Sequence, residues 1–221
     1  MIEQRQASSQ GIINTEPEPF QFEDGPVLNA ESKSVVAGAI GAILHAVGED
    51  SSRDGIIDTP SRVARMYDEL LSGYTTDSAK LLNNALFDVE YDEMVVVKDI
   101  DFYSMCEHHM LPFYGRASVG YLPEGKVIGL SKIPRLVDMF ARRLQVQARM
   151  TQQVARFLEE LIAPRGVAVV VEATHLWAAM RGVKKHHSRM VTSAMLGAFR
   201  ENPSTRNEFM MHIGTGADPL M

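Results

Sequence analysis

Two segments near the start of the chain carry apolar residues at helical spacing. In residues 31–47 the apolar side chains recur three and four positions apart, which is the period of one face of an α-helix. The second segment begins with Thr59 as a predicted N-cap and Pro60 at the first helical position, two residue types typical of a helix start. It ends at Gly73, since glycine commonly terminates helices. We therefore predict a helical extension over residues 31–75.

Later runs are rich in β-branched and apolar residues and predict strands. The first covers residues 93–104, and residues 116–130 are predicted as two short strands around a Pro-Glu-Gly turn. Two further β-rich runs cover residues 166–180 and 190–203. We expect these strands to form one sheet.

Helical patterns separate and follow the strands. Residues 132–162 are helical except for a predicted break at residues 142–144, and residues 204–213 form a final helix. Strands in pairs, with helices between the pairs, are typical of an α+β fold. We predict a single domain over residues 29–221, with its core at about residues 93–213.

The composition and charge of the chain mainly exclude classes of binding partner. Residues 1–28 are rich in Gln, Ser, Glu and Pro and show no period, so we predict a flexible tail. The chain of 221 residues has a net charge of −6, which argues against a nucleic-acid binder. A single cysteine fits a reducing compartment, and no apolar run is long enough to span a bilayer. We predict a cytoplasmic protein that binds neither nucleic acid nor membranes.

The stretch SMCEHHMLPFYG holds the only cysteine of the chain, Cys106, close to His108 and His109. A thiolate and an imidazole three positions apart suit a transition metal, and Glu107 could orient a ligating imidazole. The same residues could equally be a small buried thiol and two histidines at the end of a strand. Zinc needs at least three protein ligands, and this stretch leaves the third one open.

A candidate phosphate site follows at the start of a predicted helix. Ser131, Lys132 and Arg135 lie where a strand gives way to that helix. Backbone N–H groups and the positive end of the helix dipole favour phosphate at such a place. The alternative is a basic helix start that only contacts solvent.

A third stretch of possible chemistry covers residues 169–193. Glu172 and His175 follow an apolar strand there. A loop rich in cations and histidines comes next, with Arg181, Lys184, Lys185, His186, His187 and Arg189. These residues could border a pocket for a polyphosphate, or they could form the charged tip of an exposed hairpin. The surplus of positive charge on an acidic chain favours the pocket.

Together these stretches resemble the GTP cyclohydrolase I family. The matching segments include GEDSSRDGIIDTPSRVARMYDELLSGY, SMCEHHMLPFYGRASVGYLP, GLSKIPRLVDMFARRLQVQ, VVVEATH, MRGVKK and VTSAMLGAF, and they cover roughly residues 35–210. The resemblance implies the tunnelling fold, in which an antiparallel sheet has helices on one face and subunits join into β-barrel rings. It also implies a homodecamer with sites between subunits.

The implied reaction opens the imidazole ring of GTP. In the family, a zinc-bound water attacks C8 of the guanine, formate leaves, and the product is 7,8-dihydroneopterin triphosphate. Cys106 and His109 match the first two zinc ligands, and His108 and His175 match catalytic histidines. The implied substrate contacts are Arg62, Ser131, Lys132, Arg135, Gln147 and Arg181.

Two positions depart from the family pattern. The third zinc ligand, a cysteine in the family, is Trp177 here, and the glutamate that binds guanine is Ala148. Because an indole offers no lone pair to a metal, the predicted zinc site is incomplete. Four histidines remain as possible replacements: His108, His175, His186 and His187.

The departures leave two alternatives open. A metal-free paralogue could act on, or bind, a different purine-like or pterin-like compound, with Cys106 as an activated nucleophile. A non-catalytic homologue could instead regulate an intact enzyme.

Overall fold

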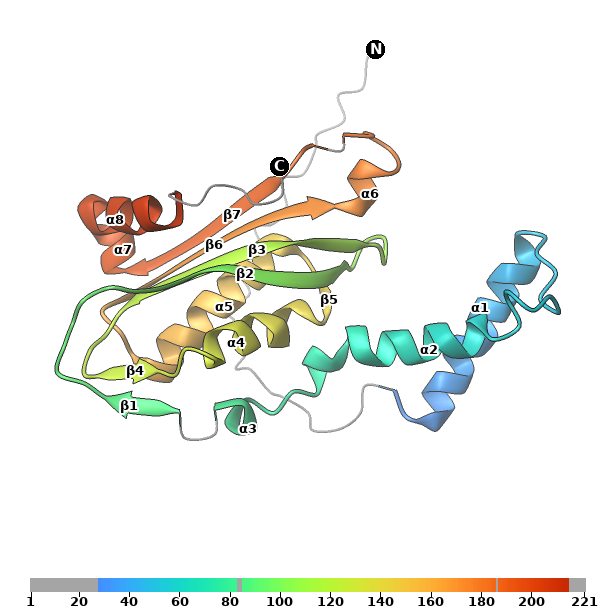
Figure 1. Cartoon of the computed structure of the whole chain (residues 1–221), viewed down its shortest axis with the longest axis horizontal. Coiled ribbons are helices and arrows are strands. Elements are labelled where there is room, and N and C mark those ends of the chain that lie inside the picture. The colour runs from blue at the N-terminus through green and yellow to red at the C-terminus, as the bar shows by residue number, and fades with distance from the viewer. Residues whose placement is uncertain (1–27, 83–84, 186, 215–221) are drawn as a thin grey trace, which may run out of the picture.

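The computed structural model describes residues 28–82, 85–185 and 187–214. The predicted tail, residues 1–28, lies outside the described residues except for Leu28. The described helices and strands follow one another as expected for an α+β fold (Figure 1). Among them, no helix combines the length and the apolar character that crossing a membrane requires.

The predicted helical extension is present and projects away from the rest of the chain (Figure 1). It consists of α1 (Ala30–Ala46) and α2 (Thr59–Leu70). The side chain of Asn29 caps α1. The predicted cap of α2 is wrong by one residue, because Thr59 is already helical and Asp58 occupies the N-cap position without a side-chain hydrogen bond.

The core is a five-stranded sheet in the order β5-β2-β3-β6-β7. Its strands are β2 (Val95–Cys106), β3 (Pro112–Leu122), β5 (Leu144–Gln145), β6 (Gly166–His175) and β7 (Met190–Gly197). The four longer strands pair antiparallel, whereas β5 pairs parallel with the end of β2. The antiparallel sheet is therefore confirmed, with one short parallel addition.

One face of the sheet carries the main hydrophobic core. Val167, Val169 and Val171 of β6 point into this core. Helices α4 (Lys132–Ala141) and α5 (Gln147–Ile162) cover it with their own buried apolar residues. The predicted break in the long helix is confirmed, since β5 lies between α4 and α5.

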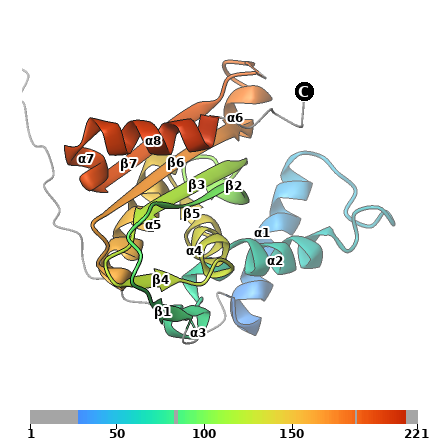
Figure 2. The same cartoon turned by 60° about the vertical axis from the view of Figure 1, so that its left-hand side comes forward.

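The C-terminal helices lie against the opposite face (Figure 2). Phe199 of α7 (Ala198–Glu201) and Phe209 of α8 (Pro203–Gly214) form a small second core with Ala168 of β6. We expected helices on one face only. The physical reason for the difference is that β6 is apolar at successive positions, so both of its faces need cover.

A small two-stranded sheet at the edge of the fold was not predicted. Strand β1 (Leu86–Asp88) pairs with β4 (Lys126–Ile128), next to the short helix α3 (Ser78–Leu82). The two strands predicted around the Pro-Glu-Gly turn in residues 116–130 are present as β3 and β4, although β3 begins earlier, at Pro112, and β4 pairs with β1 in the separate sheet. Three exposed residues are too few to give β1 a recognisable pattern.

Two predicted strands are shorter in the structure than the apolar runs that suggested them. The run over residues 166–180 stops being a strand at His175, where the short helix α6 (Leu176–Ala179) begins. The run over residues 190–203 stops at Gly197, where α7 follows. Short apolar helices and strands share the same composition, so periodicity alone cannot separate them.

Gly73 has a different role from the predicted helix stop. It lies in the 3₁₀ turn η1 (Ser72–Tyr74), and its N–H donates to the carbonyl of Arg142 at 2.9 Å. A Cβ atom at this position would lie 2.2 Å from the carbonyl oxygen of Met139. Glycine is therefore needed here because η1 lies against the backbone at the end of α4.

Candidate active site

The turn after β2 holds the cysteine and the histidine pair. Cys106 is the last residue of β2 and is 5% exposed. Its N–H donates to the carbonyl of Leu111 at 2.9 Å, and its own carbonyl accepts from the N–H of Met110 at 2.8 Å. Met110 has a φ of 52°, in the left-handed region that closes a tight turn. These bonds hold His108 and His109 at the end of the sheet.

The register of the sheet brings a third histidine to the same end. Phe113 pairs with His175, the last residue of β6, and the two rings stack at 4.8 Å. On the other side of β2, Cys106 pairs with Gln145 of β5, and α5 begins two residues later at Gln147. The ends of three strands and the start of a helix therefore meet here.

A buried amide fixes the orientation of His175. Gln147 is 1% exposed, and its Nε2 donates to the carbonyls of Val171 and Met190 at 3.1 and 2.9 Å and to Thr192 at 3.2 Å. Its Oε1 lies 2.8 Å from Nε2 of His175. Burial lowers the pKa of His175. Gln147 therefore contacts the imidazole and the sheet at the same time.

The indole of Trp177 contacts two of the histidines. Its Nε1 donates to Nδ1 of His175 at 3.3 Å. Its ring stacks on the ring of His109, with centroids 5.0 Å apart and an angle of 13° between the planes. On the other side of the turn, Nδ1 of His109 lies 4.0 Å from Sγ of Cys106.

The residues at this end do not fit the three-ligand zinc site implied by the family resemblance. Cys106 and His109 are suitable donors and lie close together. Trp177 has no lone pair to offer, and His175 already uses both ring nitrogens. The His108 ring lies 6.4 Å from that of His109 and meets it edge-on. The part of the chain that the structure describes contains no group of three His, Cys, Asp or Glu side chains arranged for a metal.

An ion pair missed by the sequence analysis holds the turn onto α5. Arg149 pairs with Glu107, and it also donates to Oε1 of Gln145 at 3.2 Å and to the carbonyl of Leu144 at 3.2 Å. The hydrogen bond from Arg149 lowers the pKa of Glu107. Glu107 lies 3.8 Å from His108, which is 65% exposed. The Glu107 carboxylate therefore lies next to His108 and not next to His109, the candidate metal ligand.

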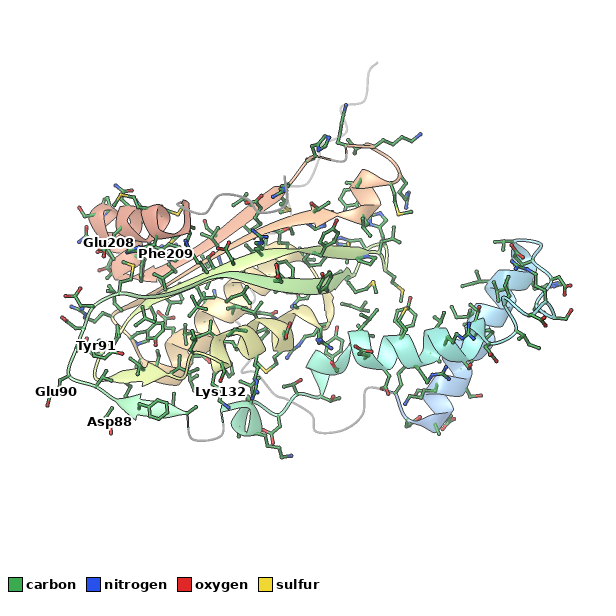
Figure 3. The ribbon with its side chains drawn as sticks, viewed as in Figure 1. Asp88, Glu90, Tyr91, Lys132, Glu208 and Phe209 are labelled. Carbon is green, nitrogen blue, oxygen red and sulfur yellow. The ribbon has the colours of Figure 1, made fainter. Side chains whose placement is uncertain are left out.

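The candidate phosphate residues lie elsewhere in the fold. Ser131, Lys132 and Arg135 are at the start of α4, which lies beside β4 and away from the turn after β2 (Figure 1). Lys132 is 8% exposed, and its Nζ donates to the carbonyl of Leu81 in α3 at 2.7 Å (Figure 3). Within one chain, the structure does not bring these residues together with the histidines.

The two remaining predicted contacts, Arg62 and Arg181, and the altered position Ala148 are exposed on three separate segments. Arg62 of α2 pairs with Asp58 at 3.3 Å. Arg181 lies in the loop after α6, together with His187, whereas His186 is outside the described residues. Ala148 is exposed in the first turn of α5.

Glu172 belongs to a different surface from His175. It pairs with Arg189 at 3.0 Å and lines a cleft of about 690 Å³ on the sheet face away from α4 and α5. Asp101, Tyr103 and Arg116 also line this cleft, but none of the histidines that the structure describes does. The pocket predicted for residues 169–193 is therefore divided between two faces.

Sequence reasoning missed Phe113 and Thr192 as well as Arg149. A signal existed for Phe113, because it lies four residues after His109 in the same matching segment. The partner of a strand residue depends on register, which the pattern of a single strand does not specify. Thr192, Gln147 and His175 are far apart in the sequence, so their contact follows only from the fold.

Comparisons with known proteins agree with this architecture. Residues 36–214 match the profile of the family described as GTP cyclohydrolase I. The GTP cyclohydrolase 1 of Chlorobaculum tepidum is 52% identical over 193 residues, covering 87% of this chain and 86% of its own. Those of Methylococcus capsulatus and Gloeobacter violaceus are 54% and 56% identical, covering 82% and 78% of this chain and 98% and 80% of theirs. The chain therefore belongs to the GTP cyclohydrolase I family.

Proposed function

We propose that this protein is a hydrolase of the GTP cyclohydrolase I type. It opens the imidazole ring of GTP and releases formate and 7,8-dihydroneopterin triphosphate. The observation that carries the proposal is the family match over residues 36–214, together with relatives named GTP cyclohydrolase 1 at 52–56% identity. His108 and His175, the two candidate catalytic residues, also lie at one end of the sheet.

The two histidines have different surroundings, and we propose different roles for them. Hydrolysis of the ring requires a group that accepts a proton from water and a group that protonates the departing nitrogen. His108 is 65% exposed and lies 3.8 Å from the Glu107 carboxylate. Burial lowers the pKa of His175 and favours its neutral form. We therefore assign proton transfer with the substrate to the exposed His108. Both ring nitrogens of His175 are hydrogen-bonded, so it can accept a proton only after its bond with Trp177 opens.

Residues for the triphosphate come from another part of the fold. We propose that Ser131, Lys132 and Arg135 at the start of α4, with Arg62 and Arg181, bind the phosphates. Because α4 starts away from the histidines within one chain, the complete site is proposed to form between subunits of a homo-oligomer, a decamer. Lys132 would have to exchange its bond to Leu81 for a phosphate oxygen.

Base recognition is proposed to be weaker than in relatives that carry the glutamate. Ala148 presents a methyl group where a carboxylate would accept N–H groups of guanine. Gln147 remains nearby, but its amide is already bonded to the sheet and to His175. Loss of such an acceptor costs roughly 1–3 kcal/mol in binding.

The alternative of a Cys106 nucleophile has less support. Cys106 is 5% exposed, whereas a reactive cysteine needs access to its substrate. The family match also favours ring hydrolysis over a regulatory role. We further propose a cytoplasmic location, on the basis of the single cysteine.

The test is turnover of GTP by the full-length protein. We expect formate and a fluorescent pterin after oxidation, and we expect His108→Ala to lower the rate by about 10²–10⁴-fold, as for the loss of an acid–base group. His45→Ala, an exposed histidine on α1, is the matched control. Absence of formate from the wild-type protein, with and without added zinc, would rule the proposal out.

A further inference from the structure

We infer that Trp177 does the orienting work that a bound metal would do at this site. The indole stacks on His109 and donates its N–H to His175, so both imidazoles are held in place without a zinc ion. The inference concerns the site of the proposed function but depends only on its donor atoms. Its test therefore measures metal content and the environment of the indole, not turnover.

The first step is the direction of the hydrogen bonds through Gln147. The backbone carbonyls of Val171 and Met190 can only accept, so the amide group facing them must be the NH₂. The amide oxygen then faces Nε2 of His175 at 2.8 Å. An oxygen that cannot donate requires a proton on that nitrogen.

The second step follows for the other ring nitrogen. With the proton on Nε2, Nδ1 of the neutral imidazole carries a lone pair. The indole N–H of Trp177, which is a donor only, points at this atom at 3.3 Å. His175 is therefore held as a single neutral tautomer, and neither of its nitrogens offers a lone pair to a cation.

The third step concerns the pair that could still bind a metal. Sγ of Cys106 and Nδ1 of His109 lie 4.0 Å apart, close enough to serve one ion together. The residue that contacts both His109 and His175 is Trp177, and it contributes no ligand. Two protein ligands hold zinc weakly, since structural and catalytic zinc sites use four or three. Trp177 thus holds His109 by ring stacking and His175 by a hydrogen bond, in place of coordination to a metal ion.

Zinc content tests the inference directly. We expect the full-length protein, after incubation with zinc and removal of free ion by gel filtration, to keep far less than one zinc per chain. Trp177→Cys supplies a thiolate at the third position, so we expect it to keep about one zinc per chain, the stoichiometry of a site with three protein ligands. One firmly held zinc per wild-type chain would overturn the inference. So would a Trp177→Cys protein that folds but holds no more zinc than the wild type.

A second measurement remains available if Trp177→Cys does not fold. Trp177 is the only tryptophan of the chain, so the intrinsic fluorescence reports on this indole alone. We expect His109→Ala, which removes the stacked ring, and His175→Ala, which removes the hydrogen-bond acceptor, each to change the emission spectrum. His45→Ala should leave it unchanged.

Added zinc completes the fluorescence test. A zinc ion bound between Cys106 and His109 would contact the ring on which Trp177 stacks. We expect no change in wild-type emission up to micromolar zinc. A saturable change at one zinc per chain, or spectra of His109→Ala and His175→Ala identical to the wild type, would contradict the inference. Neither result depends on whether the protein turns over GTP.

Discussion

Gln147 is the residue on which the arrangement of the candidate site depends most. Its NH₂ group donates to two backbone carbonyls of different strands, and its oxygen accepts from His175. The residue is 1% exposed, so water cannot replace a lost partner. In the sequence it was recognised only as a substrate contact implied by the resemblance, because its partners in β6 and β7 are distant along the chain.

Gln147→Glu tests this role with little change in shape. A carboxylate cannot donate to Val171 or Met190, so we expect the free energy of unfolding to fall by about 1–3 kcal/mol, the cost of leaving buried acceptors unpaired. Urea denaturation measures the change. Gln152→Glu, an exposed position on the same helix, should have almost no effect. Equal stability of the two variants would contradict the assigned hydrogen bonds.

His175 gives the stability a pH dependence of defined sign. Burial lowers its pKa below the ordinary value of 6.5, so the unfolded chain binds more protons than the folded chain as the pH falls below about 6.5. The stabilisation is present above this pH and is lost as the pH falls towards the folded pKa. We expect wild-type stability to fall relative to His175→Gln between about pH 7.5 and pH 5. Parallel stability curves for the two proteins would argue against this.

At the scale of elements, the sequence predicted the long helices and the main strands and missed the short pieces. Periodicity over α1 and α5 extends across several turns, and the apolar runs of β2 and β6 are long enough to recognise. The short elements β1, α3 and α6 form through contacts with distant segments, and the predicted strand β4 pairs with β1. The sequence was sufficient to predict which residue types belong to the site. Which of them touch one another depends on the register of β3 with β6, which the sequence pattern does not specify.

The contact between η1 and α4 depends on a missing side chain. A Cβ at Gly73 would lie 2.2 Å from the Met139 carbonyl oxygen and 2.7 Å from that of Arg142. We expect Gly73→Ala to lower the free energy of unfolding by about 1–3 kcal/mol, because backbone would have to move apart. Gly41→Ala on α1, where an added Cβ would have no atom from outside its own helix backbone within 4 Å, should instead raise the free energy of unfolding slightly, because alanine favours a helix over glycine. Thermal unfolding of both variants decides between the two signs.

For the whole molecule, the separation of the phosphate residues from the histidines is the main consequence of the fold. Arg135 lies in the first half of α4, whereas His175 is the last residue of β6. If one active site takes these residues from two subunits, variants of each residue should complement each other. We expect His175→Ala and Arg135→Ala to be inactive alone and to regain part of the wild-type rate after mixing and reassembly. Light scattering should give a mass about ten times 24.5 kDa.

Two outcomes would count against a shared site. Mixed variants that stay inactive, although mass measurements show that they co-assemble, would place all residues of a site in one subunit. A monomeric wild-type protein with full turnover of GTP would also place the whole active site in one subunit.

The projecting pair α1 and α2 has a consequence for how the protein can be taken apart. Val35 and Ile43 of α1 and its C-cap residue Val47 are 68%, 56% and 69% exposed, and the helix has no buried residue of its own. An isolated helix with so little cover is only marginally stable in water. When dilution dissociates the subunits, α1 and α2 should unfold before the rest of the chain. A protease should therefore cleave this pair of helices before it cleaves the sheet. The rate of this proteolysis would then measure how fast the subunits dissociate.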